Sequence, residues 1–401
     1  MKRFRGAHAA ILGAALFATG ATTLLPARIR DVSRAVEEVR GRRFSEVVAA
    51  SEMNPAALKT FLKGKIADAF PAPAEDTLRS LAVLGLIEKT PDLVERLVDF
   101  YASQVVAFYD PEPRRFYVVR GAAGGALEGS GSEELAENLL FSHELMHALQ
   151  DQSLKLDRRF RSLKDDGDRA LALQCLLEGE ATLVMVRVAL RDLPGADAAA
   201  EEALAPLLSA GALERANVPK DLPDFFVDQL FFPYVEGTAY VRRAVKRGGW
   251  KEVDRLWNEP PLSTSEILHD GRRPPPASDL LPADAGRIAP AGSRHLYSDT
   301  IGEWAARYLL RRSLGEEESV EAVSGWRGDR ITFYVSGGAL SYVWRLRFDT
   351  PGSALLFETA LRKARSKAPD RPAIVRAGAD VVVTLGFRAP PELPGFTAPK
   401  T

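Results

Sequence analysis

The run His143-Glu144-Leu145-Met146-His147 constrains this chain more than any other stretch of its sequence. On a helix, residues four positions apart lie on the same face, so both imidazoles can reach one metal ion. Imidazole nitrogens are common ligands of Zn²⁺, and Glu144 then lies beside the metal, where it can take a proton from a bound water. Zinc lowers the pKa of such a water to roughly 7. The run therefore predicts a zinc site with His143 and His147 as ligands, Glu144 as general base, and one further protein ligand.

The third ligand is expected on a second helix, predicted over about residues 168–190, which is apolar almost all round and should be buried. This helix carries Glu178-Gly179-Glu180. Burying an ionised carboxylate is costly unless it is paired or bound to a metal, so zinc coordination by Glu178 would explain its position. Glu180 is the weaker candidate, and either carboxylate could instead face solvent or pair with arginines further along the chain. Gly179 costs about 1 kcal/mol inside a helix and indicates the close approach of another backbone.

Residues one helical turn from a ligand are candidates to support it. Asp151 follows His147 by four positions and Thr182 follows Glu178 by four, so either side chain could hydrogen-bond a ligating imidazole and fix its tautomer. Asp151 could equally be a surface residue near the end of its helix. Gln150 and Gln152 are weaker candidates for the same role.

The elements around these two helices are predicted from local patterns. Two β-rich runs, 105–109 and 116–119, enclose a Pro-rich turn and indicate a hairpin. The glycine-rich stretch 121–131 lacks the Gly-Lys-Ser/Thr ending of a phosphate loop and is interpreted as a flexible connection. Ser132 is a good N-cap for the first helix, which should run to about Gln152.

The rest of the chain is predicted to be helical before this core and mixed after it. Helical spacing of apolar residues covers about residues 31–100. After Pro-rich stretches near 272–276 and 281–290, a helix is expected at about 299–312. Strands at 330–335, 341–348, 373–376 and 381–385, with a helix at 353–367, indicate a small α+β unit.

The expected fold class is therefore α+β and mainly helical. The core combines a β-hairpin edge, the helix with the histidines and the helix with the glutamate, and a small C-terminal α+β unit follows. The expected organisation is a signal peptide or membrane anchor (1–30), a helical N-terminal region (31–103), a zinc metallopeptidase-like core (104–270), a Pro-rich connection (271–298) and a C-terminal α+β region (299–401).

Charge and the N-terminus bear on location and partners. Lys2, Arg3 and Arg5 precede an uncharged stretch over residues 6–27, which is the pattern of a secretory signal or a membrane anchor. The bulk of the chain is then expected outside the cytoplasm, with membrane association through the N-terminus. The alternative is an ordinary buried helix. A formal net charge of -1 gives no indication of nucleic-acid binding.

The two motifs resemble those of known zinc enzymes. HELMHALQD (residues 143–151) resembles the active-site helix of gluzincin metallopeptidases, and thermolysin-like enzymes carry a very similar run with an aspartate at the place of Asp151. The EGEA stretch resembles the EGxA segment of M1-type aminopeptidases, whose zinc-binding glutamate aligns with Glu178. Two features depart from the pattern: Thr182 stands where thermolysin-like enzymes have an aspartate, and His147 and Glu178 are further apart. The runs HALQDQ, LLEGEAT, 260–269 and 325–330 also resemble bacterial gluzincin-like proteins of unassigned function.

This resemblance implies further features. Gluzincins place an edge strand before the active helix for an extended substrate, and residues 115–120 are the equivalent stretch here. They also use a distant Tyr or His to stabilise the oxyanion. Here the candidates are Tyr234, Tyr240, His269, His295 and Tyr297, of which His269 is preferred because its segment carries a family-like run.

Two other interpretations of the sequence compete with the metallopeptidase interpretation. Glu144-x-x-His147 and Glu266-x-x-His269 match the paired motif of di-iron carboxylate proteins, but the second lies between prolines and leaves His143 unused. A catalytically inactive zinc-binding envelope scaffold or binding protein is the stronger alternative. A purely structural site has no need of Glu144, so the sequence favours a zinc metallopeptidase that hydrolyses a peptide or protein substrate, from the envelope or outside the cell.

Overall fold

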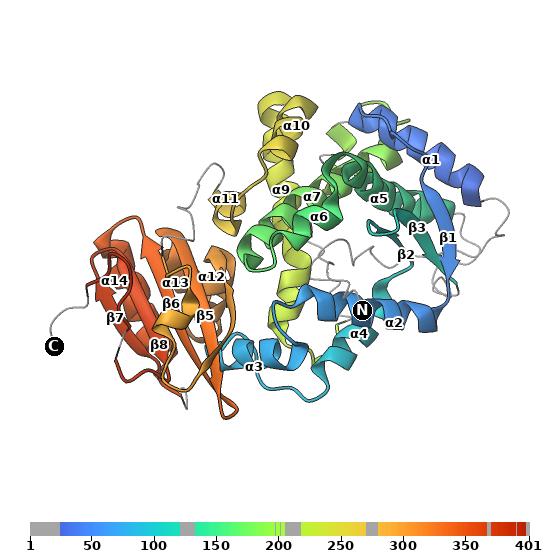
Figure 1. Cartoon of the computed structure of the whole chain (residues 1–401). Coiled ribbons are helices and arrows are strands. Elements are labelled where there is room, and N and C mark those ends of the chain that lie inside the picture. Colours follow the sequence, from blue (N-terminus) through green and yellow to red (C-terminus); the bar gives the residue numbers. More distant parts are fainter. Residues whose placement is uncertain are drawn as a thin grey trace. The chain divides into compact units, whose positions relative to one another are not determined.

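The computed structural model describes residues 25–120, 133–196, 198–200, 202–204, 218–269, 280–366, 370–389 and 391–397. The chain is α+β and divides into two compact units, neither of which is continuous in sequence (Figure 1). The first is built from residues up to 69, 90–162 and 173–260, and the second from 70–89, 163–172 and 261 onward. The stretches 31–103 and 104–270 therefore each contribute to both units.

Two expected segments lie outside the description. The glycine-rich connection at 121–131 is one of them, and the signal or anchor at 1–30 is described only from Leu25 onward, where a helix begins. Export or anchoring by the N-terminus thus stays a prediction. None of the helices in the described part of the chain combines the length and apolar character that a membrane crossing requires.

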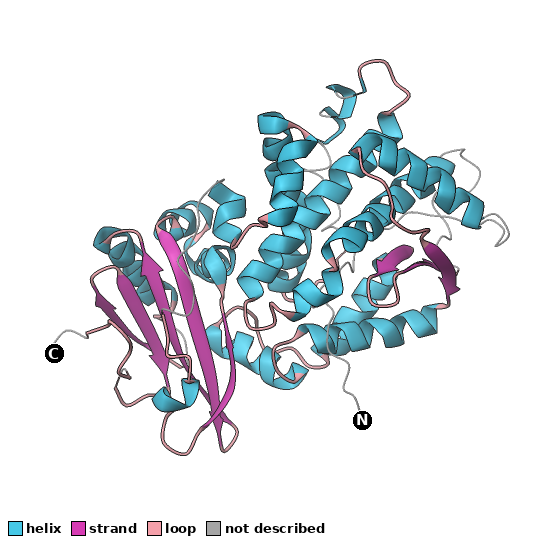
Figure 2. Ribbon diagram, turned by 45° about the horizontal axis from the view of Figure 1, so that its top comes forward, coloured by secondary structure: helices cyan, strands magenta, loops and turns pink. Residues whose placement is uncertain are grey.

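The first unit is mainly helical, with one short sheet (Figure 2). Its helices are α1 (Leu25–Arg40), α2 (Pro55–Ala69), α4 (Leu93–Gln104), α5 (Glu133–Leu154), α6 (Leu156–Arg161), the larger part of α7 (Gly167–Leu190), α9 (Asp224–Gly248) and α10 (Trp250–Asn258). The sheet consists of β1 (Ala49–Met53), β2 (Ala107–Asp110) and β3 (Arg115–Val119) in the order β1-β3-β2. Helix α5 packs on α1 and contacts both β2 and β3. The two helices expected to carry the metal ligands are α5 and α7.

The sheet corrects two expectations. The stretch 31–100 is not wholly helical, because it contains β1, whose residues AASEM give a weak strand signal. The strand β3 is not an edge, because β1 pairs with it in parallel on one side and β2 in antiparallel on the other. The edge next to α5 is instead β2. Only the tertiary fold supplies the parallel partner, which comes from a segment more than 60 positions earlier in the chain.

Helices α7 and α9 cross with their backbones in contact. A Cβ on Gly179 of α7 would collide with the backbone of Gly237 and Thr238, and a Cβ on Gly237 of α9 would collide with the backbone of Cys175. Only glycine leaves room for so close an approach. The expectation that Gly179 marks the approach of another backbone is confirmed, and the crossing brings α9 alongside the part of α7 that carries Glu178.

The second unit is built around a five-stranded antiparallel sheet in the order β4-β5-β6-β8-β7. The strands are β4 (Arg294–Asp299), β5 (Trp326–Ser336), β6 (Ala339–Phe348), β7 (Ala373–Ala377) and β8 (Asp380–Leu385), and the helices are α3 (Ala74–Leu84), α11 (Thr264–His269), η3 (Ala285–Ile288), α12 (Gly302–Leu314), α13 (Glu316–Val323) and α14 (Pro351–Ala364). The four expected strands and two expected helices are present. The additional strand β4 lies at the end of the stretch that was expected to be a connection.

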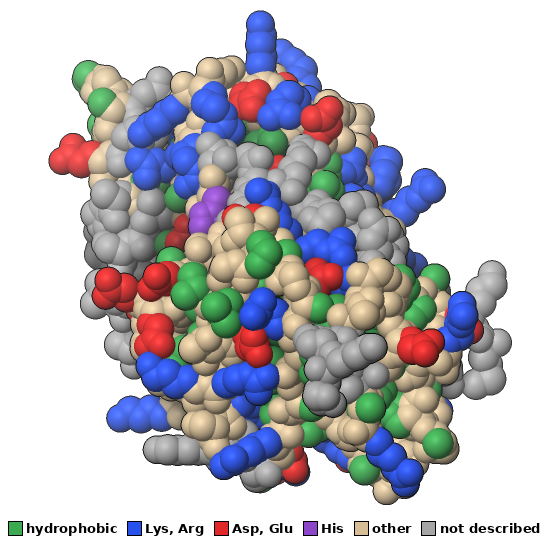
Figure 3. Space-filling view, turned by 90° about the vertical axis from the view of Figure 1, so that its left-hand side faces the viewer, with side chains coloured by type: hydrophobic (Ala, Val, Ile, Leu, Met, Phe, Trp, Pro, Cys, Tyr) green, Lys and Arg blue, Asp and Glu red, His purple; other side chains and the backbone are tan. Residues whose placement is uncertain are grey.

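Each face of this sheet is buried in a different way. Helix α14 packs on β6, β7 and β8, where the rings of Trp344 and Phe357 meet edge to face at 6.0 Å. The other face, with Tyr334 and Val343, is covered by an apolar cluster that includes Leu281. On the molecular face seen in Figure 3, Lys and Arg side chains are interspersed with Asp and Glu over the described residues.

Asp329 ties the sheet to α12. Its carboxylate accepts hydrogen bonds from the backbone N–H of Ile301 and Gly302 at the start of α12, and from the indole N–H of Trp326 and Trp344. The run over residues 325–330, which contains Asp329, therefore has a structural role in this unit.

Candidate metal centre

Three ligand-type side chains converge in the first unit. The Nε2 atoms of His143 and His147 on α5 are 3.1 Å apart, and Oε2 of Glu178 on α7 lies 3.1 Å from the first and 3.3 Å from the second. All three side chains are buried. Within the described residues, this is the group of His, Cys, Asp and Glu side chains that is arranged to hold a metal ion.

The spacing of these atoms fits a zinc ion. Four ligands at about 2.0–2.1 Å from zinc in a tetrahedron lie roughly 3.3–3.4 Å from one another. The separations of 3.1–3.3 Å among the three donor atoms are close to that value. Two imidazoles and one carboxylate are also a donor set found in catalytic zinc sites, which keep one position open.

The charges of His147 and Glu178 depend on each other. Burial by itself lowers the pKa of His147, but the Glu178 carboxylate outweighs it and raises that pKa to about 9. Burial likewise raises the pKa of Glu178, and the two imidazoles overcome this and lower it to about 2. Glu178 is therefore held as a carboxylate, and a positive charge at this point is stabilised, whether it is a proton or a metal ion.

Glu144, one position after His143, lies close enough to both imidazoles and to Glu178 for their charges to affect it. It is buried, and its Oε2 accepts a hydrogen bond of 2.9 Å from the backbone N–H of Tyr109 on the edge strand β2. Burial raises the pKa of Glu144 against the neighbouring imidazoles, which lower it. A carboxylate whose pKa is raised toward neutrality is a better proton acceptor and donor at physiological pH than an ordinary glutamate.

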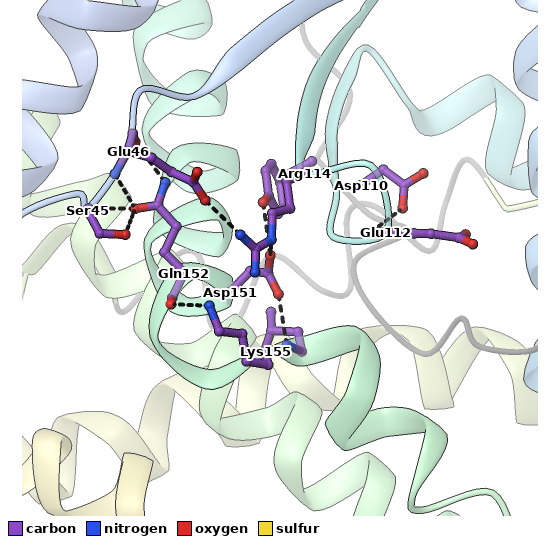
Figure 4. A network of polar contacts seen from close by, with 10 residues as sticks. Ser45, Glu46, Asp110, Glu112, Arg114, Asp151, Gln152 and Lys155 are labelled. Carbon is purple, nitrogen blue, oxygen red and sulfur yellow. Dashed lines mark hydrogen bonds and ion pairs between the residues drawn. The ribbon is translucent and has the colours of Figure 1, made fainter.

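Asp151 supports the strand and not an imidazole. Its Oδ2 accepts from the Tyr109 hydroxyl at 3.0 Å, and its Oδ1 accepts from the backbone N–H of Leu156 at 2.8 Å. Arg114, at the end of the hairpin turn, lies 3.9 Å from the same carboxylate and donates to Glu46 (Figure 4). Asp151 therefore acts on the site through Tyr109, because it fixes the strand whose backbone N–H binds Glu144.

Gln152 has a different role one position further on. Its Oε1 accepts from the backbone N–H of Ser45 at 2.7 Å, and its Nε2 donates to the Glu46 carbonyl at 2.9 Å (Figure 4). The side chain thereby fastens the segment between α1 and β1 to the end of α5. It makes no contact with an imidazole.

The residue that contacts one of the two imidazoles is Gln150. Its Oε1 lies 2.9 Å from Nδ1 of His147, and its Nε2 donates to the Leu177 carbonyl at 3.0 Å and to Glu180 Oε2 at 2.8 Å. The sequence pattern favoured Asp151 over Gln150 as the side chain that hydrogen-bonds an imidazole. The available signal was its spacing of three from His147, which places the two side chains on neighbouring positions of one helix face.

Glu180 faces away from the ligand cluster. Its Oε1 accepts from Arg40 Nε at 2.5 Å, and its Oε2 also accepts from the indole N–H of Trp257 at 2.8 Å. The carboxylate is therefore paired, not with the nearby arginines considered from sequence, but with an arginine 140 positions earlier. Among the residues that the structure describes, the buried Oγ1 of Thr182 has no hydrogen-bond partner, so Thr182 does not support an imidazole there.

The candidates for oxyanion stabilisation lie in different units. Tyr234 on α9 belongs to the first unit, and its ring stacks on His143 with a centroid separation of 5.9 Å and an angle of 21° between the planes. His269 belongs to the second unit, where its Nε2 is 2.5 Å from Oε1 of the buried Glu303. Glu266 is in the same unit as His269 and accepts from the backbone N–H of Leu262, which gives the di-iron reading no support.

The match found in comparisons with known proteins lies in the second unit. Residues 292–388 match the model of a domain of unknown function (DUF8575). This stretch runs from β4 to β8 and contains none of His143, His147 and Glu178. No curated protein and no solved structure matches the chain.

Proposed function

We propose that this protein is a zinc-dependent peptidase of gluzincin-like type. The single observation that carries the proposal is the convergence of His143, His147 and Glu178 at zinc-like spacing, with the buried carboxylate of Glu144 one position after the first ligand. The substrate class, a peptide or protein, rests on the resemblance of the HELMHALQD and EGEA runs to gluzincin motifs.

Each of these residues would have a separate role in peptide hydrolysis. When bound, zinc supplies polarisation of the scissile carbonyl and a lowered pKa for water. Glu144, oriented by the Tyr109 N–H, takes a proton from the attacking water and delivers it to the leaving amine. Tyr234, whose ring stacks on His143, would donate its hydroxyl to a developing oxyanion.

One observation favours the second candidate, a zinc-binding envelope scaffold without activity. His143, Glu144, His147 and Glu178 are only 1–3% exposed, as in a site built for structure. A peptidase with this site must open a path for its substrate.

The experiment that separates the two candidates combines metal analysis with activity. We expect one zinc per chain in the wild type and its loss in Glu178→Gln, which has the same shape but lacks the charge. Glu144→Gln should keep the zinc and the fold while hydrolysis of a peptide library falls by at least about 10²-fold, as for loss of a general base. A wild type that holds zinc but cleaves no peptide would support the scaffold, and a folded wild type that binds no zinc would sink both.

A further inference from the structure

A buried chain of polar contacts runs from the end of α1 to the ligand cluster. Arg40 donates to Oε1 of Glu180, and Oε2 of Glu180 accepts from Nε2 of Gln150. Oε1 of Gln150 then faces Nδ1 of His147 at 2.9 Å. All four side chains are between 0 and 2% exposed, so bulk solvent does not reach them.

The neighbours of Gln150 permit one orientation of its amide. The amide nitrogen faces two acceptors, the Leu177 carbonyl and the Glu180 carboxylate. If the amide were turned over, its oxygen would face two acceptors in place of a donor in a buried position, and its N–H groups would lose both of these acceptors, which is unfavourable. The oxygen must therefore point at His147, and Nδ1 of His147 must carry the proton.

We propose that Gln150, held in place by Glu180, is the positioning residue that fixes the metal-binding tautomer of His147. With the proton on Nδ1, the lone pair of the neutral imidazole is on Nε2, the atom that faces His143 and Glu178. The inference rests on the proposed metal site and adds the reason why one of its two imidazoles is preorganised.

Arg40 stabilises the buried carboxylate of Glu180, which holds Gln150 in place. A buried carboxylate needs a partner, and Arg40 supplies the positive charge on the side away from Gln150. Arg40 is in turn fixed by Asp254 at 2.6 Å and by the ring of Trp257, whose centroid lies 5.0 Å from its guanidinium carbon. The N-terminal helix α1 thus contributes to the support of a ligand on α5.

The chain offers a matched control for the test. Gln150 and Gln152 lie on the same helix, but only Gln150 contacts an imidazole. We would measure zinc affinity by competition with a chromophoric chelator for the wild type, Gln150→Met and Gln152→Met. The expected result is an affinity about 10–100-fold weaker for Gln150→Met and unchanged for Gln152→Met.

A second measurement needs no variant. In the zinc-loaded wild type, ¹⁵N NMR should show a His147 Nδ1–H proton that is protected from exchange with water. Equal zinc affinity in the wild type and Gln150→Met, or coordination of zinc through Nδ1, would overturn the inference while the proposed function stands. Weaker binding by Gln150→Met in a protein without peptidase activity would uphold the inference and overturn the proposed function.

Discussion

Glu178 and Glu180 show how two identical side chains on one helix receive different roles. Two positions on an α-helix differ by about 200°, so the carboxylates point to opposite sides of α7. Glu178 meets the imidazoles of His143 and His147, and Glu180 meets Arg40. The spacing in the sequence shows that both cannot face one metal ion. Which of them does so depends on Arg40, and no local pattern connects Arg40 to this helix.

The oxyanion role can be tested at the same scale. We expect Tyr234→Phe to lower kcat by about 10²–10³-fold with little change in KM or zinc content, because it removes only a hydroxyl donor. His269→Ala is the comparison, and it should leave kcat within a few-fold of the wild type because Nε2 of His269 is occupied by Glu303. Steady-state kinetics on a cleaved peptide checks both variants. The reverse pattern, with His269→Ala inactive and Tyr234→Phe active, would restore His269 as the preferred candidate.

At the scale of elements, the crossing of α7 and α9 brings together the helices that carry Glu178 and Tyr234 in the first unit. Gly237 permits this crossing, because its missing side chain leaves space for the backbone at Cys175. Pro233, inside α9, removes one helical hydrogen bond just before Tyr234. The hairpin and α5 form the other half of the site, where the Tyr109 N–H on β2 reaches Glu144.

The close crossing of α7 and α9 leads to a prediction about the free energy of unfolding. Gly237→Ala should lower the free energy of unfolding by about 1–3 kcal/mol, because a Cβ there forces the two helices apart. It should also weaken zinc binding, since Glu178 moves with α7. Gly64→Ala is the control: Gly64 is exposed on α2 with nothing near its Cβ position, so alanine should stabilise by about 0.5–1 kcal/mol. Chemical denaturation measures both, and a neutral or stabilising Gly237→Ala would contradict the close crossing.

At the scale of the whole molecule, the second unit carries buried carboxylates whose charge is costly. Burial raises the pKa of Asp168 well above its ordinary value and that of Asp329 to about 6. A raised folded-state pKa means that the folded protein binds a proton that the unfolded chain has already lost. The contribution of such a group to stability is therefore present at low pH and is lost as the pH rises from about 4 through the folded-state pKa.

The variant Asp168→Asn tests this dependence. Oδ1 of Asp168 accepts from the N–H and the hydroxyl of Thr264, and an asparagine oxygen can keep both bonds without a charge. The difference in melting temperature between variant and wild type should therefore grow in favour of the variant as the pH is raised from 5 to 8. Scanning calorimetry with a chelator present gives this difference free of metal effects. Parallel curves for the two proteins across this range would refute the assignment.

The sequence by itself determined the parts of this protein that rest on local periodicity. Four-residue spacing placed His143 and His147 on one helix face, and the cost of a buried charge singled out Glu178. The alternating and apolar patterns predicted α5, α7 and four strands of the second unit. The tertiary structure decided everything that depends on contacts between distant segments. Examples are the partner of Glu180, the role of Asp151 in holding Tyr109, and the central place of β3 beside β1. The physical reason is that a donor forms its hydrogen bond with whichever acceptor the fold brings within about 3 Å. The chain contains many chemically equivalent acceptors, and the sequence alone does not show which of them will be that close.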